Sequence, residues 1–222
     1  MAVTCAARLA LSAATRRQTE ICTVIFGIDL SICHSAFHLA SEEACGGLGS
    51  NIAVALARAG IGKLLLIDFD RVDISNLHRQ QYKANQIGRY KADALAENLG
   101  EIAPYTDVTA VTAKITKENF AELLKNADIV CEAFDNAEAK AMLVNGVLEQ
   151  LPDCYLVAAS GMAGMDTPNT IRTRKITKRF YLCGDEVSDA ADTIGLVAPR
   201  VMLCAAHQAH TILRILAGEH EV

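Results

Sequence analysis

The sequence predicts an α/β fold, a Rossmann-like, doubly wound and mainly parallel sheet with helices on both faces. From residue 46 onward, short apolar runs of strand length alternate with helix-like segments, and this alternation is typical of parallel sheets covered on both sides. The 222 residues are 51% apolar and 21% charged, which is enough to bury one sizeable core. One domain with a loop insertion fits the pattern better than two domains.

The first element of this alternation is a glycine-rich helix start at 46–60, for which Ser50 or Asn51 is the expected cap. A short apolar run at 63–69 follows, has the length of a strand and carries acidic residues at its end. Further helices are expected at 88–102, 116–126 with Thr116 as cap, 136–150 and 198–218, and further strands at 107–115, 128–134 and 154–160. The segment 161–197 is rich in Gly, Asp, Thr and Arg without clear periodicity, so a loop insertion is expected there.

The first 44 residues do not share this alternation. The stretch 38–43 (HLASEE) does not resemble the apolar strand that should lead into the glycines, and a strand at 22–30 would need a detour of about fourteen residues before them. The expected organisation is an atypical N-terminal segment at 1–44, with an aberrant origin of this segment as a second hypothesis, and a main domain at 45–218 that contains the insertion.

Charge and cysteine content exclude several classes of protein. The net charge of −5 argues against nucleic acid as the main partner. Asp29, His34 and His38 make a membrane span at 21–40 costly. The eight cysteines form no C-x-x-C pair, which indicates reduced thiols in a cytoplasmic protein and gives no support for zinc.

A glycine-rich loop is the first motif with chemical meaning. Gly47 and Gly49 precede a helix, and Asp68 ends the next strand 19 residues after Gly49. Such glycines let a backbone approach phosphate, and an acid at that strand end suits ribose hydroxyls. Ala44 stands where the usual first glycine would be, and the loop alone does not separate an ATP site from an NAD site or from a helix start without ligand.

The second motif is LIDFDRVDISNLHRQQY at 66–82. It carries Asp68 and Asp70, then Asn76, Arg79 and Gln80, and Lys91 follows twelve residues after Arg79. Two cations above one glycine loop suit a triphosphate better than the diphosphate of a dehydrogenase cofactor, whereas solvated surface charges are the alternative.

The third motif is Phe134-Asp135-Asn136 at the end of the predicted strand 128–134. Asp135 either caps the following helix or holds Mg²⁺ beside phosphates, because ligands bind at this edge of a parallel sheet.

In this order and spacing, the motifs resemble the ThiF family of the ubiquitin-activating-enzyme-like superfamily. The segments EAFDNAEAKAMLVN (132–145), AASGMAG (158–164), RFYLCGD (179–185) and APRVMLCAAHQA (198–209) extend the likeness, which covers residues 45 to about 218. The resemblance implies an adenylyltransferase domain that binds ATP and Mg²⁺. In such a domain, the C-terminal glycine carboxylate of a small ubiquitin-fold sulfur carrier attacks the α-phosphate and releases pyrophosphate.

By the same resemblance, Gly47 and Gly49 cradle phosphate and Asp68 holds ribose, with Asp70 beside it. The phosphate ligands implied are Asn76, Arg79, Gln80 and Lys91, of which Arg79 and Lys91 also count as catalytic. Asp135 holds the metal and is the residue most needed for adenylation. Cys183 is a candidate thiol for the second chemical step, and a small buried hydrophobe is its alternative role.

Some neighbouring side chains receive no role. His78 is a bystander at a variable position. Cys204 and His210 are about 240° apart on a helix and cannot face one metal ion together with His207, which is expected near the substrate end of the helix.

The leading hypothesis is adenylation of a ThiS-like carrier with a Gly-Gly C-terminus in thiamine biosynthesis by a homodimer. Activation of a molybdopterin-synthase carrier or of a tRNA-base carboxylate uses the same chemistry. Two other classes stay open: an NAD-dependent dehydrogenase, which leaves Arg79, Lys91 and Asp135 unexplained, and a non-catalytic protein that binds a carrier.

Overall fold

The computed structural model describes residues 36–40 and 45–222. The chain divides into Met1–Ser31 and Ile32–Val222, and the first of these units lies outside the described residues, as does the candidate strand at 22–30. The sheet consists of β1 (Ala36–Ala40), β2 (Lys63–Ile67), β3 (Asp107–Val111), β4 (Ile129–Glu132), β5 (Tyr155–Ala159), β6 (Arg172–Lys175) and β7 (Phe180–Gly184). The helices are α1 (Gly47–Arg58), α2 (Lys91–Ile102), α3 (Phe120–Leu124), α4 (Ala137–Gln150) and α5 (Ala198–Leu216).

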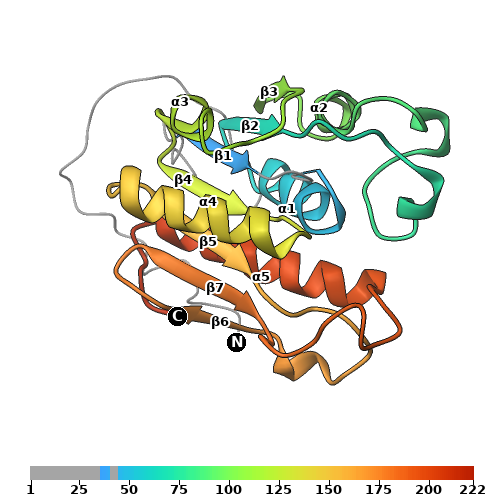
Figure 1. Ribbon diagram of the computed structural model, residues 1–222. Helices are drawn as coiled ribbons and strands as arrows, with labels where there is room; N and C mark the ends of the chain where they lie inside the picture. The colour runs from blue at the N-terminus through green and yellow to red at the C-terminus, as the bar shows by residue number, and fades with distance from the viewer. Residues whose placement is uncertain (1–35, 41–44) are drawn as a thin grey trace, which may run out of the picture. The chain divides into compact units, whose positions relative to one another are not determined.

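The strands form one sheet in the order β3-β2-β1-β4-β5-β7-β6. Every neighbouring pair is parallel except β6 and β7, which run antiparallel at one edge. In Figure 1, α3 and α4 cover one face of the sheet, and α1 and α5 cover the other. The predicted doubly wound, mainly parallel architecture is confirmed.

β1 is the first strand of the described residues and lies inside the sheet, between β2 and β4. It pairs in parallel with β2, with Leu39 in register with Leu66, and with β4, with Leu39 in register with Cys131. The expectation that 38–43 supplies no strand is therefore wrong for residues 38–40. The stretch 38–43 obscures this strand, because β1 begins at Ala36 and the polar run SEE at 41–43 follows it in the sequence.

Side chains that alternate along each strand divide the core into two layers. Ile129 and Cys131 of β4 pack with the cluster that includes α1, α2 and α5, whereas Val130 packs with the cluster that includes α3 and α4. The buried β4 thus anchors both layers, and its carboxyl end is held rigidly.

The segment 161–197 differs from its expected character as a loop, because it contains β6 and β7. β6 is a charged edge strand (RTRK), so it lacks the apolar alternation by which a strand is recognised. The ends of β5 and β7 meet closely here. A Cβ on Gly184 (φ +138°) would lie 1.8 Å from the carbonyl oxygen of Ser160, and one on Gly161 (φ +74°) would lie 2.0 Å from Asp185 Oδ1. Only glycine fits at these two positions.

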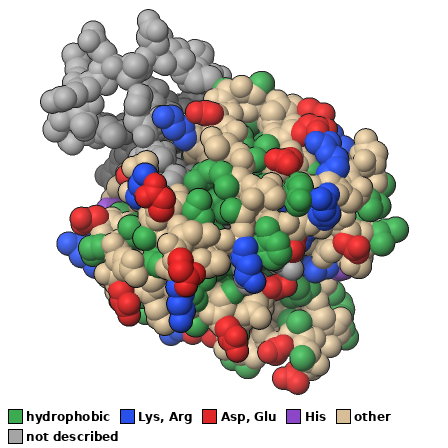
Figure 2. Space-filling view, turned by 45° about the horizontal axis from the view of Figure 1, so that its top comes forward, with side chains coloured by type: hydrophobic (Ala, Val, Ile, Leu, Met, Phe, Trp, Pro, Cys, Tyr) green, Lys and Arg blue, Asp and Glu red, His purple; other side chains and the backbone are tan. Residues whose placement is uncertain are grey.

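The surface shows no dominant charge on the face drawn in Figure 2, where acidic and basic side chains are interspersed. Among the described helices, none has both the length and the apolar character that a membrane span requires.

Candidate active site

A cavity of about 320 Å³ lies at the carboxyl ends of β4 and β5 and at the start of α1. We call it the glycine-loop cavity. Its lining includes Gly46, Gly47, Arg79, Asp135, Lys140 and Ser160. Three of the residues predicted from sequence, Gly47, Arg79 and Asp135, therefore converge on one space.

The start of α1 presents backbone N–H groups to this cavity. Gly46 is the N-cap, and no side chain caps the first turn. The expected caps Ser50 and Asn51 instead lie inside the helix, where the Ser50 hydroxyl donates to the Gly46 carbonyl (2.6 Å) and Asn51 Nδ2 donates to the Gly47 carbonyl (2.6 Å). An uncapped helix start with glycines is suited to bind an anion.

The segment 76–82 is fastened to this helix start by side-chain hydrogen bonds. Asn51 Nδ2 donates to the Arg79 carbonyl (3.0 Å), Gln81 N donates to Ser50 Oγ (3.2 Å), and the Tyr82 hydroxyl donates to the Cys45 carbonyl (2.6 Å). A Cβ on Gly47 would consequently lie 3.5 Å from Arg79 Nε. The fold thus places a guanidinium directly beside the glycine backbone.

Arg79 has donor capacity left over. Its Nη2 donates to Asn76 Oδ1 (3.1 Å), which also accepts from Gln80 Nε2 (3.1 Å). Its Nε is buried without a partner in the described part of the chain, as is Gln80 Oε1. Buried donors are rarely left unpaired, so an acceptor group in the cavity, such as a phosphate oxygen, fits this arrangement.

Several predicted nucleotide-binding residues lie outside the lining of the cavity. Asp68 is fully buried and accepts from Cys45 N (2.8 Å) and Asp70 N (2.7 Å). Burial raises its pKa to about 7, although these hydrogen bonds and Lys91 act in the opposite direction. Lys91 is only 2% exposed and forms an ion pair with Asp70 (3.1 Å). Outside the lining there are, in all, Gly49, Asp68, Asp70, Asn76, Gln80 and Lys91.

The Asp135 side chain neither caps a helix nor forms an ion pair in the described part of the chain. Asn136 caps α4, since its Oδ1 accepts from Glu138 N and Ala139 N (both 2.9 Å). Asp135 is exposed, and no described group forms a hydrogen bond or ion pair with its carboxylate. The capping role for Asp135 is wrong, and its carboxylate fits Mg²⁺, which prefers one or two carboxylates together with substrate phosphates.

An ion pair that the sequence analysis missed lies beside Asp135. The fully buried Glu132 accepts from Lys140 Nζ (2.9 Å), and the same Nζ donates to the Ala159 carbonyl (2.6 Å). Burial raises the pKa of Glu132, and Lys140 acts against this rise. A signal was present in EAFDNAEAK, where an acid ends a buried strand and a lysine follows in the next helix.

A second missed pair shapes one wall of the cavity. The buried Arg200 donates to the carbonyls of Ala163 (3.0 Å) and Asp166 (3.0 Å) and to Asp185 Oδ2. Burial alone would raise the pKa of Asp185, but the N–H groups of Ser188 and Val187, the Ser188 hydroxyl and Arg200 outweigh it and lower that pKa to about 2. Arg200, in the first turn of α5, thereby holds both the stretch 163–166 and Asp185 next to the lining of the cavity.

Cys183 does not belong to this cavity. It is fully buried in β7, and burial raises the pKa of its thiol to about 11. A protonated and inaccessible thiol is a poor nucleophile, so in this structure Cys183 fills the core. His207 also lies elsewhere, with its Nδ1 2.9 Å from Thr173 Oγ1 in a separate cavity between β6 and α5. His78 is exposed, and the described residues hold no cluster of three metal-binding side chains.

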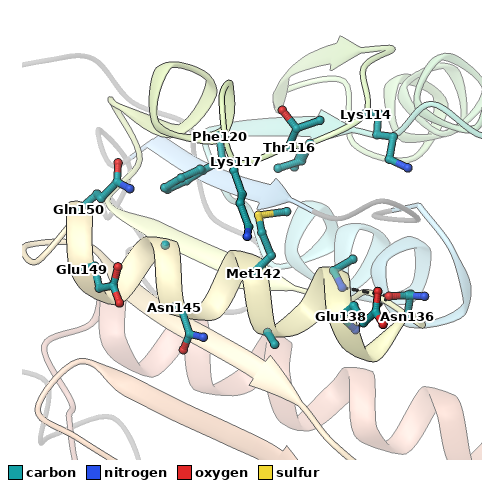
Figure 3. A pocket seen from close by; sticks show the side chains of 14 residues that line it. Lys114, Thr116, Lys117, Phe120, Asn136, Glu138, Met142, Asn145, Glu149 and Gln150 are labelled. Atoms are coloured by element: carbon teal, nitrogen blue, oxygen red, sulfur yellow. Dashed lines mark hydrogen bonds between the residues drawn. The ribbon is translucent and has the colours of Figure 1, made fainter.

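A larger cavity, of about 860 Å³, lies between the segment 114–120 and α4, and we call it the α3–α4 groove (Figure 3). Phe120, Met142 and Asn145 line it, and none of the predicted site residues does. The two cavities adjoin at the start of α4, because Asn136 borders the groove and Asp135 borders the glycine-loop cavity.

Fold and site together define an α/β protein in which an uncapped glycine-rich helix start, an arginine and a free carboxylate meet at the ends of parallel strands. The chain belongs to the ThiF family, whose model matches residues 45–222. The family assignment excludes the alternative that the chain is an NAD-dependent dehydrogenase.

Curated relatives agree with the family. The chain is 33% identical over 181 residues to the sulfur carrier protein ThiS adenylyltransferase of Bacillus subtilis, covering 78% of this chain and 53% of that protein. It is 30% identical over 176 residues to the molybdopterin-synthase adenylyltransferase of Escherichia coli, covering 78% and 70%. The chain thus spans only about half the length of the Bacillus relative.

Solved structures share the fold. The E. coli tRNA N6-threonylcarbamoyladenosine dehydratase, solved in complex with ATP, aligns with a TM-score of 0.73 at 22% identity over 84% of this chain and 87% of that one. E. coli MccB aligns with a TM-score of 0.63 at 20% identity over 84% of this chain and 57% of that one.

Proposed function

We propose that this chain adenylates a carboxylate with ATP, and that its substrate is the C-terminal glycine of a ThiS-like, ubiquitin-fold sulfur carrier. The observation that carries the proposal is the convergence of Gly47, Arg79 and Asp135 on one cavity. The names of the Bacillus and E. coli relatives support adenylyl transfer, and the name of the Bacillus relative is the support for a ThiS-type carrier.

The reaction brings together two anions that repel each other, the substrate carboxylate and the phosphates of ATP, and the site offers donors for the phosphates. The N–H groups at the start of α1 and the unpaired Arg79 Nε would bind phosphate oxygens. These donors are held in place by the hydrogen bonds from Asn51 and Gln81, so they need no reorganisation when charge develops at the α-phosphate.

Asp135 would hold Mg²⁺, which supplies neutralisation of charge on the phosphates when it is bound. The carboxylate is suited to this role because Asn136 carries the capping duty of the helix. We retain Asp68 as the proposed ribose ligand, and Asp70, Asn76, Gln80, Gly49 and Lys91 as proposed supports of the nucleotide. The proposed assembly is a homodimer, which light scattering of the purified chain tests.

The test is ATP–pyrophosphate exchange with Mg²⁺ and purified carriers that end in Gly-Gly. We expect exchange with a ThiS-type carrier and none without carrier. Exchange with a molybdopterin-synthase carrier alone would replace the proposed substrate and keep the chemistry. Carrier binding by the folded chain without any exchange would contradict the enzymatic proposal and favour a binding protein.

A further inference from the structure

Lys140 lines the glycine-loop cavity, and the proposed nucleotide-binding residues do not include it. It lies one turn into α4, and its Nζ reaches back to the ends of β4 and β5, where it contacts Glu132 and the Ala159 carbonyl. Side chains on a helix tilt toward its N-terminus, which brings this ammonium group to the wall of the cavity. A quarter of the side chain is exposed.

The ammonium group is held firmly and still has one donor to offer. Of its three N–H groups, one serves Glu132 Oε2 (2.9 Å) and one serves the Ala159 carbonyl (2.6 Å). Glu132 cannot move with a ligand, because it is fully buried and its Oε1 accepts from Phe134 N (2.6 Å). The third N–H is therefore available at a fixed point of the cavity wall.

Resting on the proposed function, we propose that Lys140 binds the substrate carboxylate that attacks the α-phosphate. Arg79 and the start of α1 already supply the phosphate donors. Lys140 extends from α4 to the end of β5, and it lines the cavity together with Ser160 and Gly161. Its charge is balanced by Glu132. A balanced ammonium orients a carboxylate by a hydrogen bond without quenching it as a nucleophile.

The chemical step itself needs no proton from Lys140. One oxygen of the carboxylate forms a bond to the α-phosphorus, and the bond from that phosphorus to the bridging oxygen of the β-phosphate breaks. The electron pair leaves with pyrophosphate, so charge and atoms balance. Lys140 acts as a substrate-binding residue, and its removal should affect the carrier and spare the nucleotide.

The experiment compares Lys140→Met and Lys140→Arg with the wild-type chain in two measurements. ATP affinity is measured by calorimetry without carrier, and the KM of a ThiS-type carrier is measured by pyrophosphate exchange at saturating ATP. We expect Lys140→Met to raise the carrier KM at least about tenfold with ATP affinity within about twofold of wild type, in line with one lost charge-assisted hydrogen bond. Lys140→Arg should restore much of the loss.

Two further variants keep the outcome decisive. Glu132→Gln combined with Lys140→Met avoids an uncompensated buried charge, and it should show the same rise in carrier KM if the single variant fails to fold. Lys117→Met in the α3–α4 groove is the matched control and should change neither measurement. A parallel loss of ATP affinity, or an unchanged carrier KM, would overturn the role of Lys140 alone, whereas absence of exchange in the wild-type chain would overturn the proposed function.

Discussion

Two cavities adjoin at the start of α4, and the smaller of them carries a buried polar group without a partner in the part of the chain that the structure describes. The α3–α4 groove is the larger, at about 860 Å³ against about 320 Å³ for the glycine-loop cavity. Among the described residues, none of the buried polar atoms that lack a partner comes from the lining of the groove, whereas Arg79 Nε borders the smaller cavity. One unpaired buried donor and one unpaired carboxylate in this described part, more than volume, distinguish the candidate site.

The largest expected effect separates two acidic residues at the start of α4. Asp135→Ala should reduce pyrophosphate exchange by about 1,000-fold, because it removes the proposed metal ligand. Glu138→Ala, which alters the groove, should leave the rate within about twofold of wild type. Equal losses in both variants would erase the distinction between the cavities.

The next effect concerns two cations. Arg79→Ala should weaken ATP binding by about 30- to 100-fold, since charge-assisted hydrogen bonds to phosphate are lost. Arg79→Lys should recover only part of the affinity, because lysine lacks the Nε donor and the planar fork. Lys117→Ala is the matched change in the groove, and calorimetry should find ATP affinity unchanged there. A full recovery by lysine would mean that charge alone suffices.

A third effect tests the wall of the glycine-loop cavity through pH. The pKa of Asp185 is lowered to about 2, so the stability it contributes is fully present above pH about 4 and is lost as pH falls toward 2. Asp185→Asn should lower the free energy of unfolding by about 2 kcal/mol at pH 6. Urea titrations should show about half of that difference at pH 3, and a difference independent of pH would contradict the role of the carboxylate charge.

The smallest effects compare two glycines: substitution of one should lower stability, and substitution of the other should weaken ATP binding. A Cβ at Gly146 would lie 2.7 Å from Phe120 Cζ in the groove. Gly146→Ala should cost about 1 kcal/mol net, because overpacking is partly offset by better helix propensity, and ATP affinity should not change. At Gly47 the nearest atom is Val201 Cγ1 at 3.3 Å. Gly47→Ala should weaken ATP binding several-fold with little loss of stability, and the reverse pattern would assign the ligand to the groove.

The sequence predicts the sheet and most helices well because their signals are local. The apolar strand before Asp68 and the helix after Asn136 lie where their patterns place them. The misses at β1 and β6 have different causes. Residues 36–40 (AFHLA) are apolar at four of five positions, but the polar run SEE at 41–43 follows them and obscures the strand in the sequence. RTRK is a charged edge strand without apolar alternation.

The candidate site was predictable only in part for a similar reason. Gly47, Arg79 and Asp135 belong to motifs with a characteristic spacing, so sequence alone places them together. Lys140 and Arg200 contribute through ion pairs with Glu132 and Asp185. The sequence shows an acid at a strand end and a lysine in the next helix, but which charged side chains meet depends on how the strands and helices pack. Cys183 shows the converse, because only the structure reveals that its thiol is fully buried in β7 and that burial raises its pKa.

Asn136, not Asp135, caps α4. Its amide oxygen accepts from the N–H groups of Glu138 and Ala139, so the Asp135 carboxylate is not needed as a cap and borders the cavity. A chain with these two side chains exchanged would keep its composition, its net charge and a well-capped α4. It would nevertheless hold the carboxylate in the cap and offer the cavity an uncharged amide. The order of these two residues thus decides whether the carboxylate caps α4 or borders the cavity.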